Sequence, residues 1–178
     1  GAALRSVTRA VQLAALRARI HVASGLYDKN VETFPLTIQE KVVQILGEGG
    51  DTTILDANGA NARTIQFVDS VGDNRLSGIS VRGGVRNEDV GAGLLLRAST
   101  MLIEDSSFVS NRMNGAWGDY SYGSGICAER SSGVIEDGRF EYNTMRGDDC
   151  NACFGGGGGI AFLDGYWLVH RSVFLGNV

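Results

Sequence analysis

The sequence has little of several things that particular functions require. Its 178 residues include one proline, two histidines and three cysteines. Three cysteines give no complete disulfide framework, and two histidines, His21 and His170, support no Ser-His-Asp or Cys-His catalytic arrangement. No run of 18 or more apolar residues occurs, so no membrane span is expected. The 20 acidic residues outnumber the 16 basic ones, giving a net charge of −4, which argues against a nucleic-acid-binding protein.

Glycine is abundant, with 26 residues, and it recurs within a repeated phrase. Each copy has a glycine-led apolar run and then a second run that ends in F-x-x-N. The copies are G-A-G-L-L-L (91–96) with I-E-D-S-S-F-V-S-N (103–111), G-S-G-I-C-A (123–128) with I-E-D-G-R-F-E-Y-N (135–143), and G-G-G-I-A-F (157–162) with V-H-R-S-V-F-L-G-N (169–177). Equivalent positions lie 32 and 34 residues apart, and a fainter copy precedes them at 65–84. Such a fixed period indicates a stack of one repeated unit.

The runs within each unit have the length and the alternation of β-strands, and turn residues separate them. The residues predicted to face inward are Ile65 and Phe67, Leu94 and Leu96, Ile126 and Ala128, and Ile160 and Phe162. Stacked parallel strands would place Phe108, Phe140 and Phe174 in an aromatic column, and Asn111, Asn143 and Asn177 in an amide ladder at a corner. We therefore predict an all-β parallel β-helix of about five to six coils.

The chain is expected to form a single domain over residues 1–178. Residues 4–18 have the apolar spacing of an amphipathic helix that caps the first coil. Residues 19–84 are assigned to the first, irregular coils and residues 85–178 to the three regular repeats. Because no capping segment follows Asn177, we expect a fragment of a longer solenoid, with end-to-end self-association at the C-terminal coil as the alternative.

The repeats resemble a known group of proteins. The pairing of G-G-A/G-I/L with F-x-x-N is similar to the repeats of chlamydial-type polymorphic membrane proteins, and more broadly to the right-handed parallel β-helices of the pectate-lyase-like superfamily. The N-terminal third is also similar to the start of such bacterial β-helices, in a short helix followed by G-x-Y (25–27), E-T-F-P-L-T-I (32–38), V-x-I-L-G-E-G (43–49) and T-I-L-D (53–56). The resemblance implies a right-handed β-helix that is secreted or at the cell surface. It implies no single activity, because the superfamily holds lyases, hydrolases, epimerases, adhesins and structural spikes.

The units differ in length at one place, between the corner residue and the next glycine-led strand. The segments 85–90, 112–122 and 144–156 should emerge on one flank and touch, because the coils stack. Aromatic rings beside charged groups suit a sugar, and the candidate ligand-binding residues are Trp117, Asp119, Tyr120, Tyr122, Arg146, Asp148 and Asp149. The alternative is that the aromatic residues only pack these loops against the solenoid wall.

The cysteines have no predicted catalytic role. Cys150 and Cys153 form a possible disulfide that would staple the longest loop if the protein is extracellular. A lone C-x-x-C lacks the second pair of ligands that a structural zinc site needs. Cys127 is expected on the outward face of its strand as a free, inert thiol.

A column of acidic residues is expected where each unit turns toward its F-x-x-N strand. The stacked residues are Glu104 and Glu136, Asp105 and Asp137, and in the third unit His170 and Arg171. The pair Glu104 and Glu136 is a candidate Ca²⁺ site, since two carboxylates about 5 Å apart could bind the ion or share a proton. The alternative is a solvated turn whose charges His170 and Arg171 balance. No other metal or cofactor is expected.

These features favour a non-catalytic extracellular or cell-surface module, adhesin-like or structural, that binds a polysaccharide or a surface protein through the stacked loops. The alternative is a fragment of a polysaccharide-active enzyme, a lyase, hydrolase or epimerase, acting along the same flank. A second alternative is a structural subunit that stacks end to end. The absence of a recognisable acid–base arrangement favours the first hypothesis.

Overall fold

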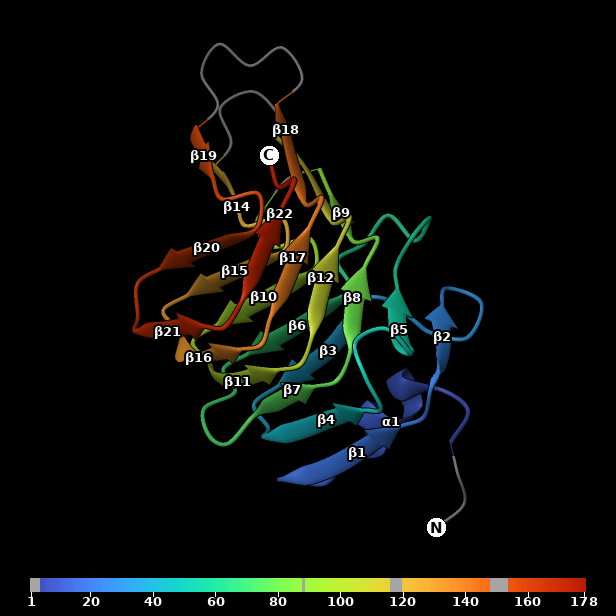
Figure 1. The fold of residues 1–178 in the computed structure, drawn as a ribbon. Helices are drawn as coiled ribbons and strands as arrows, with labels where there is room; N and C mark the ends of the chain where they lie inside the picture. Colours follow the sequence, from blue (N-terminus) through green and yellow to red (C-terminus); the bar gives the residue numbers. More distant parts are fainter. Residues whose placement is uncertain (1–3, 88, 116–119, 148–153) are drawn as a thin grey trace.

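The protein is a parallel β-solenoid preceded by one short helix (Figure 1). The computed structural model describes residues 4–87, 89–115, 120–147 and 154–178. Every strand pairs in parallel with the equivalent strand of the next coil, as in β11 with β16 and β12 with β17. This confirms the predicted all-β parallel solenoid.

Three sheets form the walls. Sheet A holds, in order, β1 (Ala18–Val22), β4 (Val43–Gly47), β7 (Arg75–Ser77), β11 (Thr100–Glu104), β16 (Ser132–Glu136) and β21 (Trp167–His170). Sheet B holds β2 (Gly25–Asp28), β5 (Thr53–Asp56), β8 (Ser80–Arg82), β12 (Ser107–Val109), β17 (Arg139–Glu141) and β22 (Val173–Leu175). Sheet C holds β3 (Leu36–Gln39), β6 (Ile65–Val68), β10 (Leu94–Arg97), β15 (Ile126–Glu129) and β20 (Ile160–Leu163).

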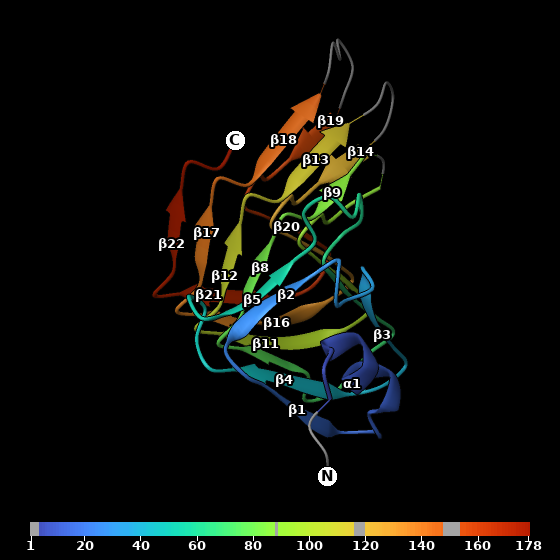
Figure 2. The same ribbon diagram turned by 90° about the vertical axis from the view of Figure 1, so that its right-hand side faces the viewer.

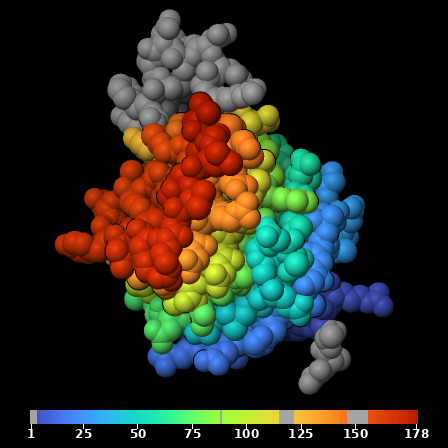
Figure 3. Space-filling model, in the orientation of Figure 1, coloured from blue at the N-terminus to red at the C-terminus, as the bar shows by residue number. Residues whose placement is uncertain are grey.

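The chain passes from sheet A to sheet B to sheet C in each coil, and the coils lie side by side in sequence order (Figure 3). From β3 to β20 it makes about four turns. The expectation of five to six coils was slightly too high. Two smaller sheets extend the later coils: sheet D with β9 (Val85–Arg86), β13 (Arg112–Gly115) and β18 (Thr144–Gly147), and sheet E with β14 (Tyr120–Tyr122) and β19 (Phe154–Gly156).

The predicted aromatic column is present in the core behind sheet B. The rings of Phe108 and Phe140 stack with centroids 5.2 Å apart, and those of Phe140 and Phe174 with centroids 4.7 Å apart. Phe108 and Phe140 are fully buried. Burial of each such ring stabilises the fold by about 1.5–3 kcal/mol.

The predicted amide ladder is also present, at the corner after sheet B. The side-chain carbonyl of Asn143 accepts hydrogen bonds from the backbone N–H of Asn111 at 3.1 Å and from its Nδ2 at 2.9 Å. Asn177 makes the same contacts with Asn143, at 3.0 and 2.9 Å. Each amide nitrogen also donates to a backbone carbonyl of the previous coil, for example Asn143 to Phe108 at 2.8 Å. The ladder therefore satisfies buried backbone groups where the strands end.

Helix α1 (Val7–Leu13) is shorter than the predicted 4–18. It begins after Ser6, whose side chain accepts from the Arg9 N–H, and Glu32 accepts from the backbone N–H groups of Val7 and Thr8 at 2.6 and 2.7 Å. It ends at Leu13, and the following residue Ala14 has an extended ψ of 124°. Its buried face covers the N-terminal end of the core, as predicted. Among the described residues, no helix has the length and apolarity to cross a membrane.

Candidate functional site

The three segments of variable length do lie together on one flank. Their strands β9, β13 and β18 pair in parallel in sheet D, and β14 pairs with β19 in sheet E. Figure 2 shows sheet D continuing beyond the strands of sheet B. The segments predicted as loops are therefore partly strands, which extend the solenoid on this side.

The structure describes only part of the predicted ligand-binding set. Trp117, Asp119, Asp148 and Asp149, and the possible disulfide pair Cys150 and Cys153, lie outside the described residues. Tyr120 lies in β14 and Arg146 in β18. Tyr122 is half-buried and packs against an apolar cluster of Val90, Leu95 and Cys127 on the outside of sheet C. At Tyr122 the ring therefore packs against the wall.

This apolar cluster explains why Cys127, although on the outward side of β15, is fully buried. Arg63 fixes the covering segment by donating to the carboxylate of Asp89 at 2.6 Å and to the backbone carbonyl of Val90 at 2.7 Å. Burial raises the pKa of the Cys127 thiol to about 12. A thiol with such a pKa is almost entirely protonated at neutral pH and is a poor nucleophile.

The predicted acidic column is in register, with Glu104 beside Glu136 and Glu136 beside His170. Each glutamate has cationic partners. Glu104 forms an ion pair with Arg75, and Glu136 forms one with Arg171 and lies 3.2 Å from the His170 ring. Within the described ranges, no group of three or more His, Cys, Asp or Glu side chains is arranged to hold a metal ion.

The turn between β4 and β5 is not among the predicted site segments. The equivalent turns of the later coils are two residues long, such as 105–106 and 137–138, whereas this one spans 48–52. Its Gly50 carbonyl accepts a hydrogen bond from Ser107 Oγ at 3.3 Å, and Arg139 lies 3.4 Å from its Asp51 carboxylate. The 48–52 loop therefore leans along the solenoid over the later coils of sheet B.

A groove runs beside this loop across the outer face of sheet B. Two adjoining hollows of about 160 and 250 Å³ form it and share Gly50, Asp51, Ser107 and Arg139 in their linings. We call it the sheet B groove, and its main polar residues are Asp51, Ser80, Arg82, Ser107, Arg139 and Glu141. The register between β8, β12 and β17 fixes the positions of these side chains. Ser80, Ser107 and Arg139 stack in one outward column, and Arg82, Val109 and Glu141 stack in another.

The charges of the sheet B groove are held in pairs. Arg139 donates to Glu141 at 2.7 Å, and Arg82 donates to Asp56 at 2.9 Å. The hydrogen bond and charge of Glu141 raise the pKa of Arg139. The Ser80 hydroxyl has no hydrogen-bond partner among the described residues. The groove therefore offers fixed charges and one free hydroxyl.

Asp105 and Asp137 lie at the end of the groove where sheet A turns into sheet B. Arg171 donates to Asp137 at 2.9 Å, and this hydrogen bond lowers the pKa of the Asp137 carboxyl. The same contacts, together with those to Glu136, raise the pKa of Arg171. The predicted acidic column therefore borders the sheet B groove.

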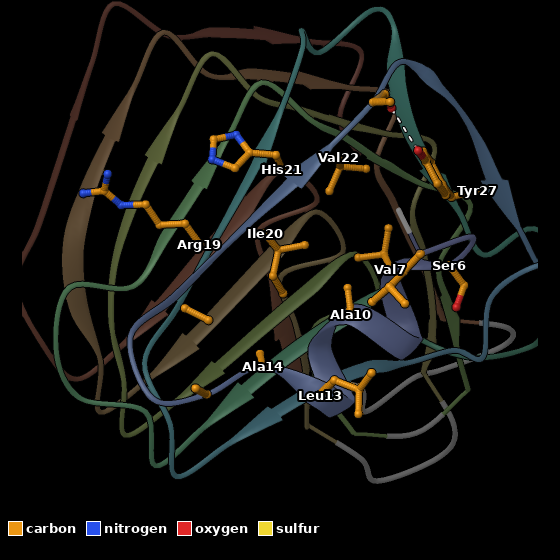
Figure 4. A pocket seen from close by; sticks show the side chains of 14 residues that line it. Ser6, Val7, Ala10, Leu13, Ala14, Arg19, Ile20, His21, Val22 and Tyr27 are labelled. Atoms are coloured by element: carbon orange, nitrogen blue, oxygen red, sulfur yellow. Dashed lines mark hydrogen bonds between the residues drawn. The ribbon is translucent and has the colours of Figure 1, made fainter. Parts of the chain in front are cut away.

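A larger hollow of about 720 Å³ lies at the N-terminal end, between α1 and β1 (Figure 4). Its walls are mainly apolar and include Val7, Leu13 and Ile20. The Tyr27 hydroxyl at its rim already donates to the Ala23 carbonyl at 3.0 Å. This hollow is the partly covered end of the core, and it has fewer polar groups than the sheet B groove.

Comparison with known protein families shows a match over most of the chain. A family model described as "Protein of unknown function (DUF1565)" matches residues 1–153. That range includes the 48–52 loop and all the main polar residues of the sheet B groove. No curated protein and no solved structure matches the chain.

Proposed function

The chain belongs to the DUF1565 family, and we propose that it is a non-catalytic, secreted or cell-surface module that binds a neutral polysaccharide in the sheet B groove. The observation that carries this proposal is the groove itself, which crosses several coils on a rigid sheet. Its hydroxyl, carboxylate and guanidinium groups are the donors and acceptors that sugar hydroxyls need.

The state of the charged groups supports binding without catalysis. A general acid or base works best with a pKa near the working pH. Hydrogen bonding moves the pKa of Asp137 down and that of Arg139 up, away from neutrality in both cases. These groups therefore act as permanent charges and do not exchange protons at neutral pH.

The charge of the lining favours a neutral ligand over an acidic one. Four carboxylates, from Asp51, Asp105, Asp137 and Glu141, line the groove with only two guanidinium groups, from Arg82 and Arg139. A ligand whose charges have the same sign as those of the binding surface is repelled and binds weakly. A polyuronate would meet this excess of negative charge, whereas a neutral chain would not.

The repeats are the support for the proposed secreted or cell-surface location. Their F-x-x-N and G-G-x-I patterns resemble those of polymorphic membrane proteins and of the pectate-lyase-like superfamily, which includes adhesins as well as polysaccharide-active enzymes. The alternative of a polysaccharide-active enzyme has one observation in its favour, namely two arginines beside carboxylates on a strand face. Turnover of a bound sugar would decide between them.

The test is calorimetric titration with cellohexaose, xylohexaose, mannohexaose and hexagalacturonate, with a reducing-end assay on the same mixtures. We expect at least one neutral hexasaccharide to bind and hexagalacturonate not to bind. Arg139→Ala should weaken binding at least about tenfold, as loss of a charged hydrogen-bonding group does. The matched control Arg19→Ala removes an exposed arginine from the outer face of sheet A and should bind as wild type.

Three results would contradict the proposal. Wild-type binding by Arg139→Ala would mean that the ligand is not in the groove. Preferential binding of hexagalacturonate would refute the assignment to neutral sugars. New reducing ends formed by the wild type, and not by Arg139→Ala, would show an enzyme.

A further inference from the structure

The corner after sheet B contains one residue that is much larger than its stacked equivalents. The stacked corner residues are Gly83, Ser110, Tyr142 and Gly176, with φ values of 68°, 53°, 54° and 61°. All four have the left-handed conformation, which glycine adopts freely and a bulky side chain adopts at a cost. Three of these residues are small. Tyr142 alone places an aromatic ring there.

Tyr142 is exposed, with 55% relative accessibility for the residue. It makes no hydrogen bond through its hydroxyl and no contact with another ring among the described residues. It lies against the backbone of Gly176, where an added Cβ would stand 2.8 Å from the ring carbons Cδ1 and Cε1. The ring therefore occupies space that only glycine leaves open, while much of its surface faces solvent.

The backbone of Tyr142 is fixed next to the sheet B groove. Glu141 precedes it and lines the groove, and Asn143 follows it as a fully buried member of the amide ladder. The backbone N–H of Tyr142 donates to the Leu175 carbonyl at 2.9 Å. A ring on such a rigid corner is preorganised to receive a ligand.

We propose that Tyr142 is the stacking platform for one sugar ring of a chain bound in the sheet B groove, and that Gly176 leaves space for it. This inference rests on the proposed function. Sugar rings present C–H faces that pack on aromatic rings, and the free phenol is available to a sugar hydroxyl. A conformation that costs stability and exposes a functional group is typical of a binding site.

The test compares Tyr142→Gly and Tyr142→Phe with the wild type, using the three neutral hexasaccharides and thermal unfolding. Tyr142→Gly restores the residue type of Gly83 and Gly176, so we expect the Tm to rise by about 2–4 °C. Its affinity for the hexasaccharide should fall at least about tenfold, which is the effect expected from the loss of one stacking contact. Tyr142→Phe keeps the ring and should bind within about threefold of wild type. Tyr166→Ser, which removes another highly exposed tyrosine, is the control and should not change affinity.

The outcomes separate this inference from the proposed function. If wild type binds none of the three hexasaccharides, both fall. If Arg139→Ala loses binding and Tyr142→Gly keeps it, the groove stands and the platform is refuted. If Tyr142→Gly loses binding but its Tm falls by more than about 5 °C, the ring supports the coil, and the platform is again refuted.

Discussion

Removal of one amide from the ladder should destabilise the solenoid strongly. In Asn143→Ala, four hydrogen bonds of a fully buried side chain disappear: two accepted from Asn111 and two donated, to the Phe108 carbonyl and Asn177 Oδ1. At about 1 kcal/mol for each neutral hydrogen bond, the loss is about 4 kcal/mol. One of these four bonds is accepted from the buried Asn111 N–H, which is left without an acceptor, so we expect the loss to reach this value. Most domains are stable by only about 5–15 kcal/mol.

The assay is equilibrium unfolding in urea, followed by circular dichroism, with Asn177→Ala as the matched control. Asn177 makes the equivalent bonds except the donation to a following asparagine, and it is only partly buried in the last coil, where water can replace the lost partners. We expect it to cost about 1 kcal/mol. A loss below about 1 kcal/mol for Asn143→Ala, or equal losses for the two variants, would refute the role of the ladder.

Three further outcomes are expected. Glu32→Gln should lower the urea midpoint by the equivalent of about 2 kcal/mol, because the carboxylate accepts from the first N–H groups of α1; an unchanged midpoint would contradict this. Cys127 in the native protein should react with a disulfide reagent at pH 8 at least about 100-fold more slowly than in urea, because burial raises its pKa to about 12; equal rates would show an accessible thiol. The folded-state pKa of Asp137 is lowered by Arg171, so the pair's stabilisation is present above the ordinary aspartate pKa and is lost as pH falls through the lowered value. Tm measured against pH should therefore fall less steeply below about pH 4 in Arg171→Ala than in wild type. The same pH dependence of Tm in both proteins would contradict the pairing.

The stacked features of the fold could be predicted because each depends on one repeated position. Phe108, Phe140 and Phe174, and the three asparagines, recur at fixed positions in the repeat, and parallel pairing places equivalent residues in contact. The shared flank of the long segments followed from the same register. The length of α1 could not be predicted from the repeat, because Glu32, 25 residues away from Val7, determines where the helix begins.

The sheet B groove could not be predicted from the repeats, because the 48–52 loop lies in the irregular part of the chain. Its contacts join residues 57 and 88 positions apart, as in Gly50 with Ser107 and Asp51 with Arg139. The available signal was length, since the G-E-G-G-D run at 47–51 makes this turn longer than its equivalents. The special place of Tyr142 was visible only in comparison, as the one large residue among Gly83, Ser110 and Gly176.

Sugar binding in the sheet B groove is tested most directly by mapping backbone amide chemical-shift changes when a neutral hexasaccharide is added to isotope-labelled protein. We expect the largest changes at Ser80, Ser107 and Arg139, which line the groove, and at Tyr142 beside it. Changes confined to the hollow between α1 and β1, or to sheets D and E, would contradict this prediction.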